Sequence, residues 1–245
     1  MSTRTWTSTV VAGLLAIAHP LAAQEVEPPV AFSGSATFVN DYTFRGISQT
    51  SEGSAVQAGI DAAMGSAAYV GLWGSSLDFG EADAAGRATA EIDIFGGVAL
   101  PLGSVDADLG ITYYSYPGTV DSYKYNFVEF AVGLSTAISS ATLGAKMAYS
   151  PDYFAASGSA VYLGGSLGID VPDTSLSLSA TLGRQTIETN ANFGTPNYVD
   201  YSVSASVSLL GIGLGAAIVG TNLEESDCFG GSELCNTRVV LSIGM

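Results

Sequence analysis

Apolar and polar residues alternate with a period of two through most of this chain. In residues 105–113 every second side chain is apolar, and Asp, Gly and Thr lie between them. The same alternation recurs in 175–185 and 199–209, where serines dominate the polar positions. Successive side chains of a β-strand point to opposite faces, so this pattern predicts strands with one apolar and one polar side.

Applied throughout, this pattern predicts about twelve strands. They are expected at 32–45, 54–63, 67–75, 88–100, 104–115, 125–137, 140–150, 158–170, 174–185, 197–209, 212–221 and 236–245. Short connections at 64–66, 101–103, 138–139, 171–173 and 210–211 alternate with longer ones at 46–53, 76–87, 116–124, 151–157, 186–196 and 222–235. Outer-membrane barrels have short periplasmic turns and longer extracellular loops.

The distribution of apolar residues favours a closed barrel. After residue 23, no stretch approaches the roughly 18 consecutive apolar residues of a spanning helix. In hydrocarbon all backbone N–H and C=O groups must pair within the protein, which permits only helices or closed barrels. A soluble β-sandwich also has alternating strands, but it needs no strict alternation of short and long connections. The sequence therefore predicts an all-β fold, an antiparallel transmembrane β-barrel.

Aromatic residues near the expected strand ends suit such a barrel, because interfacial rings anchor it at headgroup depth. Each of them could also be an ordinary packed ring. They are Phe38, Tyr42, Phe44, Tyr69, Trp73, Tyr113, Tyr114, Tyr116, Tyr123, Tyr149 and Tyr198.

The first 23 residues have the features of a secretory signal peptide: Arg4, an apolar stretch at 10–18, and Ala22 with Ala23. The alternative, a transmembrane anchor, needs about 20 apolar residues, and this stretch is interrupted after about half that length. We expect cleavage near Ala23, a short periplasmic segment at 24–31 and the barrel at 32–245. The mature protein would then lie in the outer membrane of a Gram-negative bacterium.

Charge and histidine content exclude several functions. Removal of the signal would leave six Lys and Arg against 23 Asp and Glu, which argues against binding nucleic acid. The single histidine, His19, would be lost too, so no Ser–His or Asp–His pair remains for catalysis. Carboxylate pairs on one strand are explained by the alternation alone. We expect no catalytic residue, no enzyme activity and no cofactor.

Two cysteines, Cys228 and Cys235, lie seven residues apart in one polar stretch. In a secreted chain a local disulfide is the natural inference, with two free thiols as the alternative. Two cysteines without a histidine do not make a tetrahedral metal site, so no metal is expected.

Charged residues on the polar strand faces would line the lumen if the apolar faces meet lipid. This inferred pore-lining set is Asp61, Glu91, Asp93, Asp106, Asp108, Glu129, Lys146, Asp170, Arg184, Asp200 and Arg238. An excess of carboxylates stabilises a cation in a narrow pore and disfavours an anion. The alternative is that these groups pair with Lys146, Arg184 and Arg238 and only fill the lumen.

Several ordered motifs resemble the TorF family of proposed porins, also described as the Gcw_chp proteins. They are DYTFRGISQT at 41–50, AVQAGID at 55–61, GLWGSSLDF at 71–79, EIDIFGG at 91–97, YYSYPG at 113–118, SPDYF at 150–154 and CNTRVVLSIGM at 235–245. The resemblance implies an outer-membrane barrel of porin type and draws attention to Asp41, Tyr42, Phe44, Arg45 and Gly46, with Arg45 near the outer end of the first strand. One departure is the last residue, Met245, where outer-membrane proteins usually have an aromatic residue.

The sequence thus predicts a porin for passive diffusion of small solutes, with a preference for cations. Its expected partners are outer-membrane lipid, small solutes or ions, and the barrel-insertion machinery during biogenesis; it would be a monomer or an oligomer. The alternative is a non-conducting structural or surface-recognition barrel, for which the acidic loop 222–235 is the best candidate surface.

Overall fold

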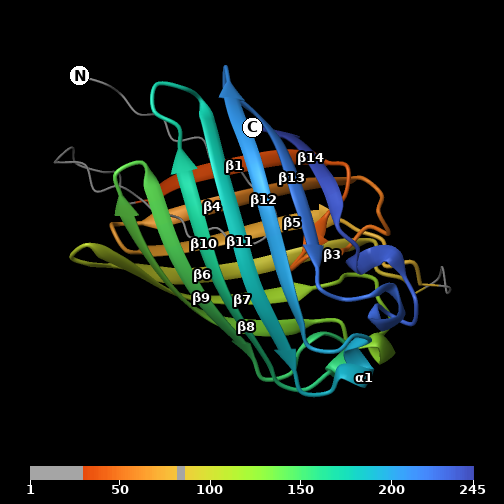
Figure 1. Cartoon of the computed structure of the whole chain (residues 1–245). Coiled ribbons are helices and arrows are strands. Elements are labelled where there is room, and N and C mark those ends of the chain that lie inside the picture. The colour runs from red at the N-terminus through yellow and green to blue at the C-terminus, as the bar shows by residue number, and fades with distance from the viewer. Residues whose placement is uncertain (1–29, 82–85) are drawn as a thin grey trace.

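In the computed structural model, which describes residues 30–81 and 86–245, twelve antiparallel strands form one closed barrel (Figure 1). Two further strands, β2 (Thr43–Phe44) and β3 (Ile47–Ser48), form a separate small hairpin. The barrel strands are β1 (Val30–Val39), β4 (Ala55–Met64), β5 (Ala68–Ser76), β6 (Ala90–Leu102), β7 (Val105–Ser115), β8 (Phe127–Ile138), β9 (Ala141–Ser150), β10 (Ala160–Asp170), β11 (Leu176–Ile187), β12 (Tyr198–Leu209), β13 (Ile212–Thr221) and β14 (Arg238–Gly244).

The barrel closes between its first and last strands. Thr37 pairs with Gly244 and Val39 with Ser242. Beyond the end of β14, Ala36 and Met245 exchange two backbone hydrogen bonds of 3.0 and 2.9 Å. Since β1 also pairs with β4 along its whole length, every barrel strand has a partner on both sides.

The two ends of the barrel differ in their connections. The end with the short connections at 65–67, 103–104, 139–140, 171–175 and 210–211 is called the turn end, and Val30 and Met245 lie there too. The opposite, loop end carries the longer connections with the short helices η1 (Asp121–Tyr123), η2 (Phe154–Ala156), α1 (Asn190–Phe193), η3 (Glu225–Asp227) and η4 (Glu233–Cys235). The expected alternation of short and long connections is confirmed.

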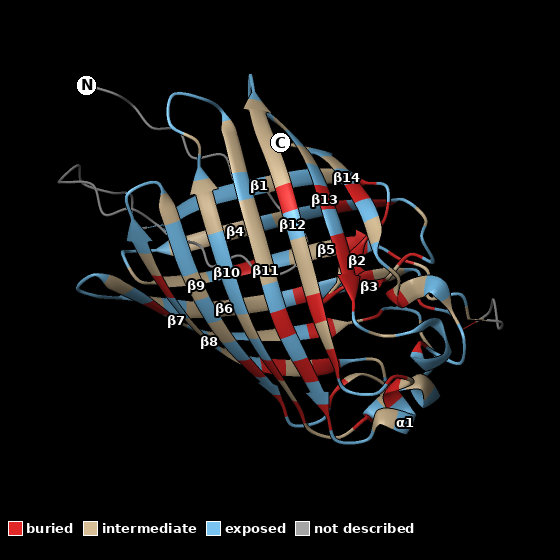
Figure 2. Cartoon of the chain, in the orientation of Figure 1, coloured by how far each residue is buried: buried red, intermediate tan, exposed pale blue. Residues whose placement is uncertain are grey.

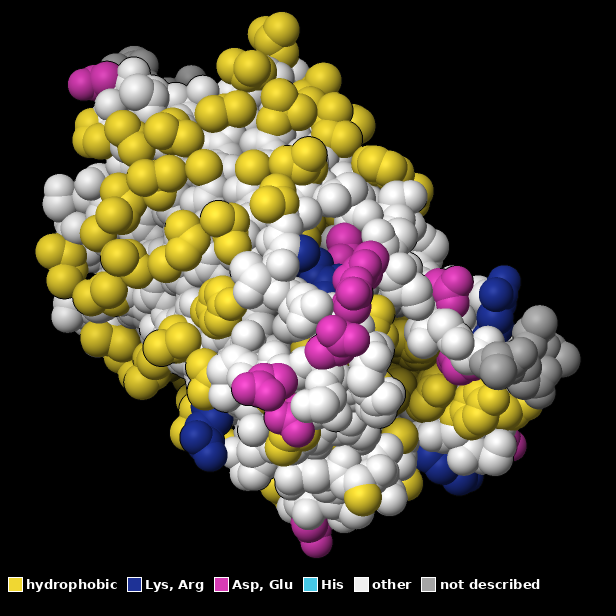
Figure 3. Space-filling model, turned by 45° about the vertical axis from the view of Figure 1, so that its right-hand side comes forward, with side chains coloured by type: hydrophobic (Ala, Val, Ile, Leu, Met, Phe, Trp, Pro, Cys, Tyr) yellow, Lys and Arg dark blue, Asp and Glu magenta, His cyan; other side chains and the backbone are white. Residues whose placement is uncertain are grey.

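Large apolar side chains cover the outside of the barrel wall. Val203, Leu182 and Phe32 are 61, 62 and 74 % exposed, and Figure 3 shows the wall covered with hydrophobic residues. The residues between them face inward and are mostly polar or small. This arrangement is the reverse of that in a soluble protein. It is the one expected of a membrane barrel, whose strands expose apolar side chains to lipid and polar ones to the lumen.

The predicted strands agree with the observed ones except for the first. The expected strand at 32–45 is wrong beyond Val39, because the chain leaves the wall there and residues 41–50 fold into the barrel. The other predicted boundaries lie within two residues of the observed ones.

The expected aromatic girdle is wrong for most of its members. Phe38, Tyr113 and Tyr149 are 41 to 48 % exposed on the outer wall. Tyr42, Tyr114, Tyr116 and Tyr198 are instead buried inside, and Phe44, Tyr69, Trp73 and Tyr123 are partly buried away from the lipid-facing positions or in the loops. Position near a strand end does not reveal which face a ring occupies.

The expected signal peptide at 1–23 and most of the 24–31 segment lie outside the described residues. Strand β1 begins at Val30, two residues before the expected start of the barrel. Within the described part of the chain, no helix is long and apolar enough to cross a membrane.

We predict that Val203→Arg, in the middle of β12 on the outer wall, lowers the free energy of unfolding by about 2–4 kcal/mol, because it places a cation in hydrocarbon. Urea unfolding of the protein folded into lipid vesicles measures this change. The control is Ser206→Arg, on the inward face of the same strand, which should cost much less. Equal losses in both variants would contradict the assignment of faces.

Candidate functional site

The segment Asp41–Thr50 forms a hairpin inside the barrel, the lumenal hairpin. All of its residues are buried or half-buried. Thr43 pairs with Ser48 and Phe44 with Ile47, so Arg45 and Gly46 form a two-residue loop. Both have positive φ, 47° and 80°, as a type I′ turn requires. The tip therefore presents Arg45 at the end of a rigid turn.

Arg45 binds side chains from several strands of the barrel wall. Its Nη1 and Nη2 donate to the Glu129 carboxylate on β8 at 2.9 and 2.8 Å. Nη1 also donates to Gln185 Oε1 on β11 at 2.7 Å, and the guanidinium carbon lies 4.2 Å from the centre of the Tyr162 ring on β10. These contacts on β8, β10 and β11 place the tip within the lumen.

The Arg45–Glu129 ion pair is almost fully excluded from solvent, with side chains 2 and 4 % exposed. Burial alone would lower the pKa of Arg45, but the Glu129 carboxylate raises it further, so its net pKa lies above the ordinary value and the guanidinium stays charged. A bidentate Arg–carboxylate pair fixes both distance and orientation. The pair is thus a geometrically specific anchor for the hairpin.

Gly46 allows the tip to approach the wall closely at β13, two strands away from β1. A Cβ at this position would lie 2.5 Å from the Gly220 carbonyl oxygen and 2.8 Å from Thr221 Cγ2, both on β13. Positive φ and this close approach both require glycine. Together with Arg45, Gly46 shows that the hairpin reaches across the lumen.

The base of the lumenal hairpin is held by Asp41. Its Oδ1 accepts hydrogen bonds from Ser48 Oγ at 2.7 Å and Thr50 Oγ1 at 3.0 Å. Its Oδ2 accepts from Arg238 Nη1 of β14 at 2.8 Å, and Arg238 also lies 3.2 Å from the Glu52 carboxylate. The first and last residues of the motif are thereby tied to each other and to the wall.

Tyr42 attaches the hairpin to a third side of the barrel. Its hydroxyl donates to Glu91 on β6 at 3.0 Å, and Tyr116 donates to the other oxygen of Glu91 at 3.2 Å. The Tyr42 ring also packs edge-on against Trp73, with ring centres 5.4 Å apart. Asp41, Tyr42 and Arg45 of the motif are therefore structural partners of charged residues on the barrel wall, which the sequence alone did not show.

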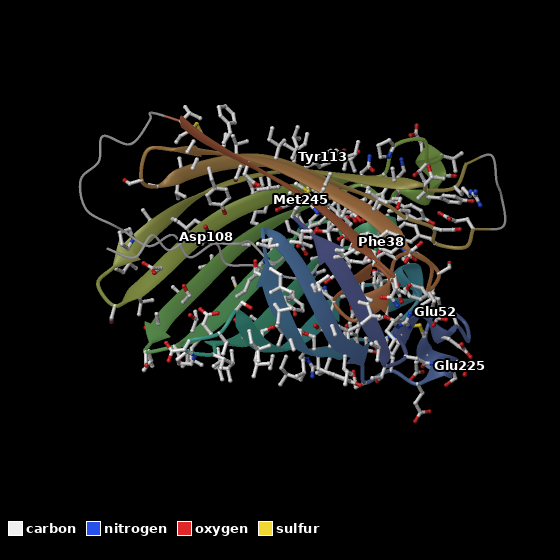
Figure 4. All side chains as sticks on the ribbon, turned by 90° about the horizontal axis from the view of Figure 1, so that it is seen from above. Phe38, Glu52, Asp108, Tyr113, Glu225 and Met245 are labelled. Carbon is white, nitrogen blue, oxygen red and sulfur yellow. A yellow bond between two sulfur atoms is a disulfide. The ribbon has the colours of Figure 1, made fainter. Side chains whose placement is uncertain are left out.

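Most predicted pore-lining residues face inward but lie at different depths. Glu91, Asp93, Glu129 and Asp200 are buried in the half of the lumen nearer the loop end, and Asp61, Asp108 and Lys146 are partly buried nearer the middle or the turn end. Asp106 and Asp170 lie near the turn end and are exposed. Figure 4 shows Asp108 well away from the loops that carry Glu52 and Glu225.

Arg184 is a correction to the predicted set. It is exposed and shares the outward face of β11 with Leu178 and Leu182, while Gln185 is the buried inward neighbour. Because side chains alternate between the two faces of a strand, Arg184 faces outward and its neighbour Gln185 faces the lumen. Near the loop end, an arginine can extend its charged group toward the membrane surface.

Tyrosine hydroxyls pair with several lumenal carboxylates. Tyr114 donates to Glu129 at 3.2 Å, Tyr162 to Asp200 at 3.2 Å and Tyr69 to Asp108 at 3.0 Å. These hydroxyl donors add no positive charge beside Asp108 and Asp200, whereas Glu129 is also paired with Arg45. Among the described residues, Asp93 Oδ1 is buried without any hydrogen-bond partner.

The half of the lumen toward the turn end is lined by small and hydroxyl-bearing residues. Along β12 these are Ser202, Ser204, Ser206 and Ser208, and β11 contributes Ser177, Ser179 and Thr181. Several inward residues there, such as Ser33 and Ser166, are exposed. Figure 2 shows the buried residues concentrated toward the loop end. The barrel is thus open at the turn end and narrowed near the loop end.

Above the lumenal hairpin, the loops enclose a cavity of about 240 Å³, here named the vestibule. Phe44 and Ile47 of the hairpin form part of its lining, and Tyr153 and Tyr198 are buried beside it. Asn192 and Phe229 are exposed lining residues, so the vestibule reaches the outer surface of the loop end.

Cys228 and Cys235 form a disulfide, with Cα atoms 6.0 Å apart, and both are buried among the loops. The sequence-based expectation of a local disulfide is confirmed. Among the described residues, no three His, Cys, Asp or Glu side chains gather as a metal site would require.

Comparison with known proteins places the chain in a family. Residues 23–244 match the model of a family described as a bacterial protein of unknown function (Gcw_chp). The chain belongs to this family. The Gcw_chp part of the resemblance is confirmed, while the TorF name stays a prediction. No curated protein matches the sequence.

Two solved porins share the fold. The KdgM porin, in complex with disordered oligogalacturonate, has a TM-score of 0.57 at 6 % identity, covering 87 % of this chain and 98 % of the porin. The NanC porin has a TM-score of 0.56 at 8 % identity, covering 86 % and 98 %. At these identities the likeness shows the fold alone: this Gcw_chp protein has the closed β-barrel fold of these porins.

We predict that Arg45→Met lowers the free energy of unfolding by about 3–5 kcal/mol, because it leaves Glu129 buried without its cation. Denaturant unfolding in lipid vesicles measures the loss. Adding Glu129→Met to Arg45→Met should recover much of it. Arg238→Met, which breaks a more exposed pair, is the control and should cost less; an equal cost would contradict the anchoring role of Arg45.

Proposed function

We propose that this protein is an outer-membrane channel for passive diffusion of small solutes, narrowed by the lumenal hairpin. The observation that carries the proposal is the lumen itself, which is open and hydroxyl-lined at the turn end and contains the charged side chains around Arg45 near the loop end. A wet, polar lumen crossed by an inward-folded loop is an arrangement found in outer-membrane channels.

The dimensions limit the solutes. Twelve strands about 4.8 Å apart and tilted near 40° give a backbone diameter of roughly 24 Å. Side chains and the hairpin occupy much of this width near the loop end. The proposed channel would therefore admit ions and small molecules and exclude folded proteins and long polymers.

The charges inside the lumen support a preference for cations. Glu129 is paired with Arg45, and Asp41 with Arg238. Outside these two pairs, Lys146 is the one basic side chain among the described inward-facing barrel residues. The inward carboxyl groups outnumber it; they are Asp61, Glu91, Asp93, Asp108 and Asp200. Because a low-dielectric wall strengthens charge interactions, this excess lowers the energy of a cation in the lumen.

The setting follows from the proposed channel. The protein would reach the outer membrane of a Gram-negative bacterium after removal of the signal peptide, with lipid against its apolar wall. Small solutes or ions and the barrel-insertion machinery would be its partners, as a monomer or an oligomer. On this orientation, the loop end faces the outside of the cell and the turn end faces the periplasm.

A second candidate is a non-conducting recognition barrel. The observation in its favour is the packed loop end, where the lumenal hairpin and the ring cluster around Tyr116, Tyr153 and Phe193 occupy the section above Glu129 apart from the vestibule. In that case the loops would bind a partner and nothing would pass. Conductance separates the two candidates.

We predict that the protein in a planar bilayer conducts steadily, with a reversal potential in a salt gradient that favours cations. Asp108→Asn should shift this potential toward zero by several millivolts, because it removes an inward carboxylate from the middle of the lumen. The measurement is single-channel current under a tenfold gradient of potassium chloride.

The matched control is Asp106→Asn, which removes the same charge at the wide turn end and should change the potential little. A folded but silent barrel would reject the channel and favour recognition. A conducting barrel with no cation preference, or with equal effects of both variants, would reject only the proposed selectivity.

A further inference from the structure

The vestibule is lined by aromatic rings from almost every loop. Phe44 comes from the lumenal hairpin, Phe79 follows β5, and Tyr125 precedes β8. Phe154 lies in η2, and Phe229 belongs to the loop of the disulfide. Surface loops are usually polar. Loops that only joined neighbouring strands would not need to bring so many rings together around one cavity.

The rings are arranged as flat surfaces around that space. Tyr125 and Phe154 are stacked, with centres 4.3 Å apart and planes 13° apart. Phe79 stands edge-on to both, at 5.5 and 5.4 Å. Packing alone would let these rings fill the centre, yet a cavity of about 240 Å³ remains between them. A molecule of one or two rings fits this volume and shape.

The charge around the vestibule is negative. Glu81 is the only charged side chain among the described lining residues, and its Oε1 accepts the Ala88 N–H at 3.2 Å. Glu81 lines the same cavity as the stacked rings of Tyr125 and Phe154, and burial together with the Glu81 carboxylate raises the pKa of Tyr125. Asp152, Glu188, Glu224, Glu225 and Asp227 are exposed on the surrounding loops, and Figure 3 shows acidic groups gathered there.

We infer that the vestibule is a binding site for a small aromatic molecule that carries an ammonium group. The rings would stack on its flat part, and aromatic faces also attract the cation. Glu81 would pair with the ammonium group, while the acidic loops draw the cation toward the opening. Sugars also stack on rings, but they need many hydrogen-bonding side chains, and besides its tyrosines and Glu81 the described lining offers only Ser48, Gln49 and Asn192.

This inference goes beyond the proposed channel and does not depend on it, because a silent barrel can still bind a ligand at its loop end. Its test uses binding rather than current. The probe is tryptamine, an indole with an ammonium group. Indole-3-acetate, which carries a carboxylate on the same ring system, is the matched anion, and 3-ethylindole is the uncharged analogue.

Isothermal titration of the folded full-length barrel in detergent should show saturable binding of tryptamine and none, or at least tenfold weaker binding, of indole-3-acetate. Phe154→Ala should raise the tryptamine Kd about tenfold, and Glu81→Gln should raise it several-fold without changing the Kd of 3-ethylindole. Tyr113→Ala removes a ring from the outer wall and should leave binding unchanged.

Heat-dependent mobility on gels checks that each variant folds, and Phe154→Leu replaces Phe154→Ala if the smaller residue prevents folding. Absence of saturable tryptamine binding would overturn the inference. So would equal affinity for indole-3-acetate, or unchanged affinity in the folded Phe154 variant. If the Kd of 3-ethylindole rises as much as that of tryptamine in Glu81→Gln, the role of the ammonium group is rejected.

Discussion

Pairing of every backbone N–H and C=O along a closed ladder is the constraint on which the rest of this structure depends. Pairing of β1 with both β4 and β14 removes the sheet edges, which hydrocarbon would not tolerate. Once the wall is closed, the period of two sends apolar residues such as Val203 to the lipid and serines to the interior. The lumen is then the place where charges can gather.

The lumenal hairpin uses that interior. Its anchors lie on different sides of the barrel: Glu91 on β6, Glu129 on β8, Gln185 on β11 and Gly220 on β13. Three of these anchors form hydrogen bonds with the hairpin, and Gly220 allows its backbone to approach closely. Directional contacts therefore hold the hairpin, in addition to apolar packing. A buried ion pair contributes little net stability compared with apolar residues, but breaking it is costly. We interpret Arg45–Glu129 as the contact that fixes the position of the hairpin.

The sequence predicted the wall well and the interior poorly, for a physical reason. Alternation reports which residues share a face, so the twelve strands and the inward positions of Asp93, Glu129 and Asp200 followed from it. It carries no information on a segment that leaves the wall. Residues 41–45 continue the alternation of β1 in the sequence, yet in the structure they turn inward. They do so because Asp41 binds Arg238 and Arg45 binds Glu129, and these partners are separated by 197 and 84 residues in the sequence. Gly46, a residue that tolerates the positive φ of a type I′ turn, was the local signal available.

The most direct test of this account is the single-channel conductance of a barrel whose hairpin residues 42–49 are replaced by a short glycine-serine linker. If the lumenal hairpin forms the narrowest part of the lumen, conductance should rise several-fold and the ion preference should change, since the linker widens the lumen and removes Arg45, the cation paired with Glu129. Conductance and selectivity equal to those of the unmodified protein, in a barrel shown to be folded, would contradict the account.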